Sequence, residues 1–211
     1  MRRTPVSLAL VAVGCAAVAL AAPSSAASAP AKVAFSDPAG DALATQKTYD
    51  ITDVLVTSTG TTSTKKVGKK TVTTYTPKAI LVKLTVAGSF ATTAGANYEV
   101  DLDVAGCGYA NFTYTPGAIS EGGLFTECGS PADETGSTST LYDAPPTVSG
   151  KTVTWQLPLS ALSKEFKPGV LLSDIRALAA QNDPVFGIIG AGALAAEGNF
   201  DNASTSATLR L

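Results

Sequence analysis

The segment Lys78-Ala79-Ile80-Leu81-Val82-Lys83-Leu84-Thr85-Val86-Ala87 decides the fold class, because apolar residues recur at every second position. Successive side chains of a strand point to opposite faces, so one face of this strand carries Ile80, Val82, Leu84 and Val86. We expect this face to lie in the core. The same alternation returns at residues 97 to 105, where the apolar face holds Tyr98, Val100, Leu102 and Val104.

Short alternating runs broken by Gly, Pro and Asn extend in both directions from this segment. Such spacing is typical of a β-sandwich or barrel and not of a helical bundle. We therefore predict a single all-β domain over residues 30 to 211, an antiparallel β-sandwich of jelly-roll-like type. Its predicted strands are residues 31 to 36, 51 to 58, 70 to 76, 78 to 87, 97 to 105, 109 to 115, 137 to 142, 151 to 157, 171 to 179 and 204 to 211.

Three segments interrupt the alternation. Residues 61 to 70 hold four lysines and predict the exposed tip of a long hairpin, with polyanion binding as the alternative to a solvated loop. Residues 116 to 136 are rich in Gly and Pro and predict a long loop. Residues 187 to 198 are rich in Ala and Gly, and they fit either a short helix or a flat strand.

Residues 1 to 29 have the features of a secretory signal peptide. Two arginines precede an apolar run from 6 to 22, and a zone of small residues follows it. We expect cleavage after Ala26 or Ala27 and export of the mature protein, with no membrane span after cleavage. The alternatives are an uncleaved membrane anchor and lipid acylation at Cys15.

The charge and the cysteines of the mature chain narrow the possible partners. Without Arg2 and Arg3 the 15 basic residues become 13, against 17 acidic ones, for a net charge of −4. This charge argues against nucleic acid as a partner. In an oxidising compartment we expect Cys107 and Cys128 to form one disulfide, and two free thiols are the alternative.

Histidine is absent from the chain. A Ser-His-Asp nucleophile system, a His-Glu-x-x-His zinc site and a histidine general base are therefore excluded. The run from Gly187 to Gly192 lacks both the Lys-Ser/Thr of a P-loop and the dinucleotide-binding spacing, so we expect no nucleotide cofactor.

Acidic residues occupy the polar face of strand 97 to 105, at Glu99, Asp101 and Asp103. Alternate carboxyls on one strand lie about 6.5 to 7 Å apart, which touches the range of inverting glycosidases. A solvated face is the commoner arrangement, and we expect Lys83 to be its cross-strand partner. We therefore predict a non-enzymatic protein, and a carboxylate-dependent extracellular hydrolase using these acids is the alternative.

The turn Asp37-Pro38-Ala39-Gly40-Asp41, followed by Asp50, is the most specific motif. Proline presets one turn residue and glycine supplies a permissive backbone, so the aspartates can converge. Calcium prefers six to eight hard oxygen ligands, and we name Asp37, Asp41 and Asp50 as candidate calcium ligands. The alternative is a plain turn in which the carboxylates bind local backbone amides.

Three segments carry a family resemblance: the acidic turn with Asp50-Ile51-Thr52, the segment 155 to 162 beginning Trp155-Gln156, and the segment Asn199-Phe200-Asp201-Asn202-Ala203. Together they resemble secreted bacterial β-sandwiches related to DOMON and family 9 carbohydrate-binding modules. The export signal is similar to those of high-GC actinobacteria. The resemblance implies a jelly-roll-like sandwich, sometimes with structural calcium, that binds sugars, haem or nothing known. This chain has one Trp and no His, so the usual haem ligand pair is missing and the aromatic platform for sugar is thin.

Trp155 shares a strand face with Val153 and Leu157, and we expect it in the core. Exposed Trp155 stacking on a sugar is the alternative, and the other candidate stacking residues are Tyr109, Tyr114 and Tyr142. The function predicted from the sequence is ligand binding or a structural role at the extracellular surface, with a glycan or another cell-surface component as the expected partner.

Overall fold

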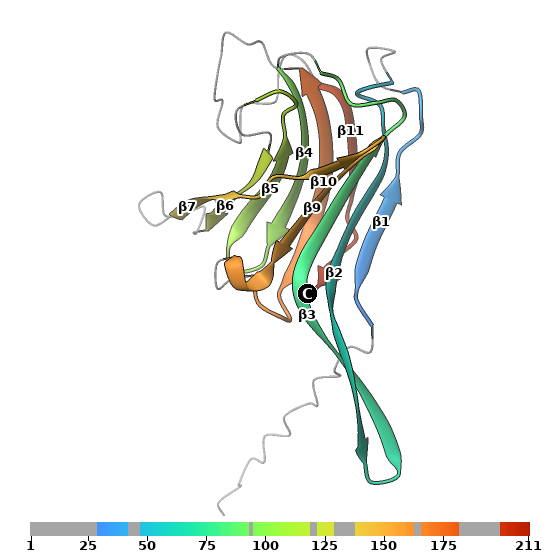
Figure 1. Cartoon of the computed structure of the whole chain (residues 1–211), viewed down its shortest axis with the longest axis vertical. Helices are drawn as coiled ribbons and strands as arrows, with labels where there is room; N and C mark the ends of the chain where they lie inside the picture. Colours follow the sequence, from blue (N-terminus) through green and yellow to red (C-terminus); the bar gives the residue numbers. More distant parts are fainter. Residues whose placement is uncertain are drawn as a thin grey trace, which may run out of the picture.

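The structure is a computed structural model that describes residues 29–41, 47–92, 95–118, 122–128, 138–162, 166–181 and 199–211. These residues form two antiparallel β-sheets packed face to face (Figure 1). Their one helical element is a 3-10 turn, Leu159–Ala161 (η1). No helix within these ranges is long and apolar enough to cross a membrane. The predicted all-β antiparallel sandwich is confirmed.

The five-stranded sheet has the order β1-β2-β3-β9-β8. Its strands are β1 (Lys32–Ser36), β2 (Ile51–Val67), β3 (Lys70–Val86), β9 (Thr152–Pro158) and β8 (Thr147–Ser149).

The seven-stranded sheet has the order β11-β10-β4-β5-β6-β7, and β12 pairs with β10 beside this path. Its strands are β11 (Asn199–Thr205), β10 (Leu171–Gln181), β4 (Ala96–Val104), β5 (Gly108–Tyr114), β6 (Gly122–Cys128), β7 (Thr138–Asp143) and β12 (Leu209–Arg210). The chain crosses between the sheets after β3, β7 and β9, and β11 lies beside β1 and β2 at one edge of the sandwich.

The predicted apolar faces fill the space between the sheets. Val82 and Leu102 are buried there, and Trp155 has no exposed surface, which confirms it as a core residue. The indole Nε1 of Trp155 donates a hydrogen bond of 2.9 Å to the carbonyl oxygen of Thr113. Because a buried indole N–H needs an acceptor, this bond satisfies the ring and also joins β9 of one sheet to β5 of the other.

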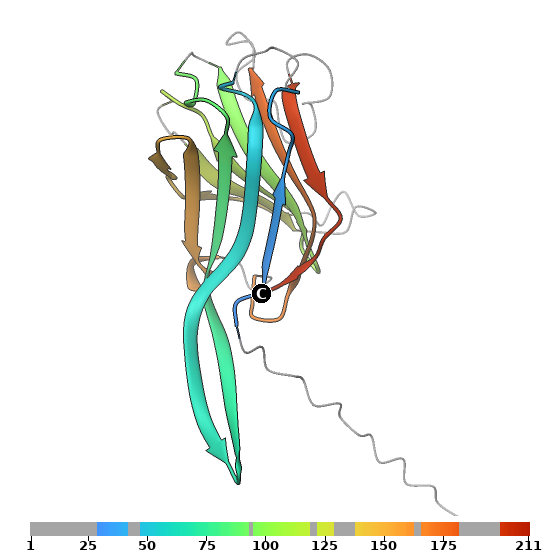
Figure 2. The ribbon, with the colours of Figure 1, turned by 90° about the vertical axis from the view of Figure 1, so that its right-hand side faces the viewer.

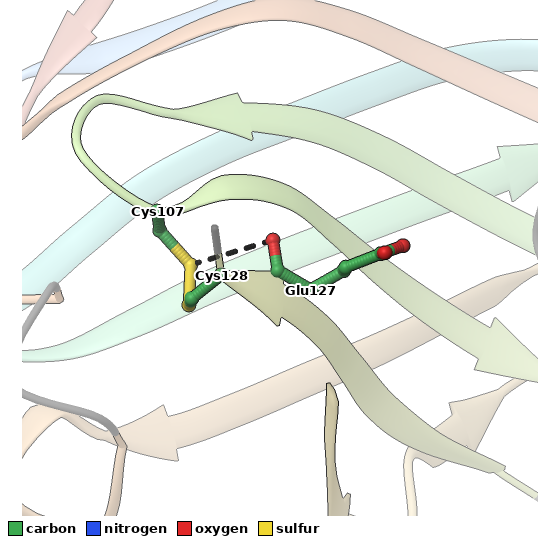
Figure 3. The surroundings of a disulfide bond; sticks show 3 residues. All are labelled: Cys107, Glu127 and Cys128. Carbon is green, nitrogen blue, oxygen red and sulfur yellow. Dashed lines mark hydrogen bonds between the residues drawn. A yellow bond between two sulfur atoms is a disulfide. The ribbon is translucent and has the colours of Figure 1, made fainter. Parts of the chain in front are cut away.

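Cys107 and Cys128 form the predicted disulfide. Figure 3 shows that it joins the β4–β5 turn to the end of β6. The dashed contact in Figure 3 places Cys107 Sγ 3.8 Å from the carbonyl oxygen of Glu127. A disulfide sulfur carries no hydrogen, so we treat this as a packing contact and not as a donated hydrogen bond. The disulfide thus fixes one corner of the seven-stranded sheet.

The β2–β3 hairpin continues far beyond the sandwich as a two-stranded arm (Figures 1 and 2). We define the arm as residues 60 to 77, which pair from Gly60–Pro77 to Val67–Lys70 after a register shift at Thr59/Gly60. A Cβ atom at Gly60 would collide with the carbonyl oxygen of Thr76, so glycine permits the close approach of the strands where the arm leaves the body. The predicted hairpin is confirmed, and its turn is limited to Gly68 and Lys69.

Several predicted boundaries were wrong. The predicted strands 70 to 76 and 78 to 87 are one strand, β3, because Pro77 is accommodated at the register shift. The predicted strand 204 to 211 is instead the end of β11 followed by the two-residue β12. Strand β8 was not predicted.

Part of the predicted loop 116 to 136 is strand β6, which pairs with both β5 and β7. Its first residue, Gly122, has no room for a side chain, because an added Cβ would meet the carbonyl oxygen of Thr113 and the ring of Pro146. The glycine that suggested a loop is therefore a packing requirement. Residues 1 to 28 of the predicted signal region, 1 to 29, lie outside the described residues, as does the segment 187 to 198.

Candidate functional site

Four aspartates gather where β11 meets the start of β2, and we call Asp37, Asp41, Asp50 and Asp201 the acidic junction. Asp37 follows β1, Asp50 directly precedes β2, and Asp201 lies within β11. Carboxylate oxygens of Asp37, Asp41 and Asp201 lie within 4.8 Å of one another. The sandwich therefore brings together residues that are about 160 positions apart in the chain.

Backbone hydrogen bonds hold the acidic junction in place. The amide of Asp37 donates to the carbonyl oxygen of Thr52 at 3.0 Å, which extends the β1–β2 ladder to the turn. Gly40 has a positive φ of 93°, a conformation that favours glycine, and its amide donates to Asp50 Oδ2 at 2.7 Å. The acidic turn thus folds back onto Asp50.

Asp201 connects the two sheets. Its Oδ2 accepts a hydrogen bond of 2.6 Å from the amide of Ile51, and its Oδ1 accepts one of 2.8 Å from the amide of Asn202. Ile51 belongs to the five-stranded sheet and Asp201 to the seven-stranded sheet. The carboxylate therefore closes the edge of the sandwich at which the two sheets meet.

Two carboxylate oxygens of the acidic junction are buried without a hydrogen-bond partner, Asp37 Oδ2 and Asp50 Oδ1. Asp50 as a whole is only 3% exposed. A buried polar atom with no partner is uncommon and costs about 1 to 3 kcal/mol, more when it is charged. Two such atoms beside two further carboxylates make this cluster a candidate site for a cation.

The electrostatics of the acidic junction lead to the same conclusion. Burial, together with the negative charges of Asp201, Asp41 and Asp50, raises the pKa of Asp37 to about 6. Burial also raises the pKa of Asp201, and the charges of Asp41 and Asp50 add to that effect, while its two backbone hydrogen bonds oppose it. The four carboxylates therefore repel one another at neutral pH.

The donor set fits a hard divalent cation. Every candidate side-chain ligand is a carboxylate oxygen, which suits calcium or magnesium and not the softer metals that prefer nitrogen or sulfur. Calcium accepts irregular oxygen shells of six to eight ligands, whereas magnesium demands a near-ideal octahedron. We therefore regard calcium as the better fit for an acidic junction built from a turn, a strand start and a strand of the opposite sheet.

The structure modifies the ligand set named from the sequence. Asp37 and Asp41 lie together as expected, and Asp201 completes the trio. Asp50 is held beside the trio by the amide of Gly40, and its charge acts on Asp37 and Asp201. Asp201 was not among the predicted ligands, because it belongs to a segment that carries only the family resemblance and no local sequence pattern marks it as a ligand.

A second carboxylate cluster lies on the face of the seven-stranded sheet that points away from the core. We call Asn97, Glu99, Asp101, Tyr109 and Asn111 the polar network. Asn111 Nδ2 donates to Glu99 Oε2 at 2.9 Å and to Asp101 Oδ1 at 2.5 Å, and Asn97 Nδ2 donates to Glu99 Oε1. Tyr109 donates its hydroxyl to Asp101 Oδ1 at 2.9 Å. Side chains of two adjacent strands thus share one hydrogen-bonded array.

The predicted solvated face was wrong at Glu99, which is only 8% exposed. Burial raises the pKa of Glu99, and the charge of Asp101 raises it further, while hydrogen bonds from the two asparagines lower it. The pKa of Asp101 is raised by burial and lowered by its bonds to Asn111 and Tyr109. Burial also raises the pKa of Asp103, together with the charge of Asp174.

The predicted cross-strand partner of these acids was also wrong. Lys83 lies opposite Thr154 and Leu55 in the five-stranded sheet, because the chain changes sheets between β3 and β4. The basic residue opposite Asp101 is instead Arg176 of β10, whose charge lowers the pKa of Asp101.

The candidate stacking residues have different surroundings. Tyr114 is buried in an aromatic cluster with Phe90 and Tyr98, so it has no face free for a ligand. Tyr109 belongs to the polar network. Tyr142 lines a cavity of about 390 Å³ together with Leu141, Asp143 and Gln156.

Comparison of the chain with protein-family models, with curated proteins and with solved structures found no match.

Proposed function

We propose that this protein is a secreted, non-catalytic β-sandwich that binds calcium at the acidic junction and serves as a binding or structural module at the extracellular surface. The observation that supports calcium is the pair of buried oxygens without a partner, Asp37 Oδ2 and Asp50 Oδ1. Hydrogen bonds already occupy the oxygens of Asp201 and Asp50 Oδ2, so the cluster is positioned before an ion arrives.

Each residue of the acidic junction would have a separate task. Asp37, Asp41 and Asp201 would bind the ion directly, since their oxygens already converge. Asp50 would orient the turn through the amide of Gly40 and offer its second oxygen. A bound cation would offset the repulsion among the carboxylates and would join β11 to the end of β1, which stabilises the sandwich edge.

Calcium titration by isothermal calorimetry tests this proposal. We expect saturable binding of one calcium ion per chain, with weaker binding of magnesium. Asp201→Asn should weaken calcium binding by at least tenfold, because it removes a converging charge. Asp143→Asn is the matched control, since Asp143 is an exposed aspartate in β7 at the far edge of the same sheet. A wild-type protein that takes up no calcium would refute the assignment.

A carbohydrate is the ligand class that we propose for the module. The cavity beside β7 offers the carboxylate of Asp143 and the carboxamide of Gln156, which are groups that hydrogen-bond to sugar hydroxyls. Tyr142 adds an aromatic ring to the same cavity. A glycan array with and without calcium tests this part. Binding that requires calcium would link the two sites, and an array without hits would leave the structural role.

A carboxylate-dependent hydrolase is the second candidate, because Glu99 is a buried acid with a raised pKa next to Asp101. That arrangement is one way to hold a general acid. Against it, each oxygen of Glu99 already accepts a hydrogen bond from an asparagine. Asn111 and Tyr109 both donate to Asp101 Oδ1, so the two acids are engaged within the protein. Hydrolysis of aryl glycosides by the wild type but not by Glu99→Gln would replace our proposal with this one.

A further inference from the structure

The charge of the arm contrasts with the rest of the mature chain. Residues 54 to 98 contain six lysines and no aspartate or glutamate, although the predicted mature chain is acidic overall. Four of these lysines are Lys65, Lys66, Lys69 and Lys70, all exposed at the end of the arm. The arm extends over eight residue pairs, or about 25 Å, so it presents this charge well away from the acidic body.

One face of the arm combines charge with apolar surface. Residues paired across the hairpin share a face, and the register pairs Lys65 with Val72 and Val67 with Lys70. These four residues therefore lie together, and we call them the tip face. Val67 is 59% exposed and Val72 is 42% exposed. They are two of the four large hydrophobic residues that the described chain leaves exposed.

Solubility alone does not explain this arrangement. Lysines on an unpaired edge protect an exposed hairpin from joining other strands, and this would account for the charge. It gives no reason for two exposed valines between the lysines. Lysines that alternate with apolar residues instead fit a surface that offers both negative charge and an apolar interior, as an anionic lipid bilayer does.

The orientation of the domain is consistent with such a surface. β1 runs antiparallel to β2, with Lys32 opposite Thr57 and Ser36 opposite Asp53, so Lys32 marks the end of β1 nearer the arm. The arm therefore projects from the same end of the sandwich as the start of β1 (Figure 1). The acidic junction lies at the other end of β2, away from the arm.

We propose that the tip face docks on the surface of an anionic lipid bilayer. Lys65 and Lys70 contact the headgroups, and Val67 and Val72 enter the boundary between headgroups and acyl chains. Lys69, in the turn, and Lys66, on the opposite face, add to the attraction. Docking does not involve the acidic junction, so it is independent of the proposed calcium site.

Vesicle sedimentation with the exported protein collected from culture medium tests this proposal. The probes are phosphatidylcholine vesicles with and without about one third phosphatidylglycerol, at low and high salt. We expect binding to the anionic vesicles alone, with affinity that falls as salt rises. Lys65→Gln combined with Lys70→Gln should weaken binding about 25-fold, because each lysine near a charged membrane contributes a factor of about five.

Matched variants separate the bilayer from other partners. Lys78→Gln combined with Lys83→Gln removes the same charge from the body of β3 and should have a much smaller effect. Val67→Thr combined with Val72→Thr should weaken vesicle binding several-fold, whereas Val148→Thr, which changes an exposed valine of β8, should not. Circular dichroism of each variant checks that the fold is intact.

Three results would overturn the proposal. The first is no binding of the wild type to anionic vesicles. The second is equal loss in the arm and body lysine variants, which would indicate attraction to net charge alone. The third is binding to heparin or polyphosphate with the same affinity as to vesicles and with no loss in the valine variants. This result would identify a soluble polyanion as the partner. Since none of these measurements uses calcium, failure here leaves the calcium proposal untouched.

Discussion

The acidic junction and the polar network both hold several carboxylates in a partly buried site, but the carboxylates differ in their hydrogen-bond partners. In the polar network, asparagine amides and a tyrosine hydroxyl donate to Glu99 and Asp101. In the acidic junction, Asp37 and Asp50 each keep one buried oxygen without a partner. The number of acids is therefore a poor guide to an ion site.

This difference assigns the two clusters different roles. Neutral donors can compensate a buried carboxylate, and a network of this kind is complete within the protein. Carboxylates whose nearest neighbours are other carboxylates are relieved by protonation or by a cation. If the acidic junction is a calcium site, as we propose, its stability responds to an external ion, whereas that of the polar network does not. The predictions below test this contrast.

The largest loss of stability should come from a buried carboxylate that has neither hydrogen-bond donors nor a bound ion. Leu102→Asp places a charge in the buried core, and burying an unpaired charge costs several kcal/mol against a total stability of about 5 to 15 kcal/mol. We expect no folded protein by circular dichroism. Leu141→Asp is the control, because Leu141 is 76% exposed and the variant should fold normally. A folded Leu102→Asp protein would show that the strand faces are misassigned.

A smaller loss should follow when the polar network loses its shared donor. Asn111→Ala removes the amide that bonds to both Glu99 and Asp101, and we expect a loss of about 3 kcal/mol in the free energy of unfolding. Calcium should not restore it, because the acidic junction is a separate site. Urea denaturation measures the loss, with Asn202→Ala, an exposed asparagine of β11, as the control. Rescue of Asn111→Ala by calcium would mean that the two clusters act as one.

The acidic junction should make the stability of the folded protein depend on pH, and the sign of this dependence follows from the pKa of Asp37. The pKa of Asp37 is raised to about 6 in the folded protein from an ordinary value of 3.8, so protonation of Asp37 favours the folded state. In chelator, this contribution to stability is fully present below about pH 4 and is lost as the pH rises through 6. Calcium binds the ionised form, so the increase in melting temperature caused by calcium should shrink from pH 7 to pH 5. An increase that is larger at pH 5 would contradict the pKa assignment.

The smallest effect is expected on the arm. Lys69 lies in the exposed turn, and Lys69→Asp should change the free energy of unfolding by less than about 0.5 kcal/mol, as is usual for surface substitutions. Thermal melting in calcium and in chelator measures this. A large destabilisation would mean that the arm is packed against the body and is not a free hairpin.

The sequence predicted the core well because a strand that buries one face carries apolar residues at every second position. Val82 and Leu102 are buried as that period requires, and Trp155 follows the same rule. Strand β6 escaped prediction because Gly122 and Gly123 start it, and glycine there reflects the close approach of neighbouring backbone. Composition does not distinguish a glycine needed for packing from one needed for a turn.

The sites were less predictable, since strand pairing decides them. The acidic turn and Asp50 are close in sequence and could be recognised, whereas Asp201 reaches them only through the pairing of β10 with β11 and the closure of the sandwich edge. Alternation placed Glu99 on a polar face, but its donor Asn111 comes from β5. Lys83 was misassigned because consecutive strands, β3 and β4, belong to different sheets.

The measurement that tests our central claim most directly is thermal melting at pH 7 of the wild type and Asp37→Asn, each in excess calcium and in chelator. A ligand at a hundredfold excess over its Kd stabilises the folded state by about 2.7 kcal/mol. We therefore expect calcium to raise the wild-type melting temperature by roughly 5 to 10 °C. Asp37→Asn should melt as high as the wild type or higher in chelator, because it removes a repelled charge, and it should lose most of the response to calcium. Identical wild-type curves in calcium and chelator would contradict the account and leave the acidic junction as a turn without an ion.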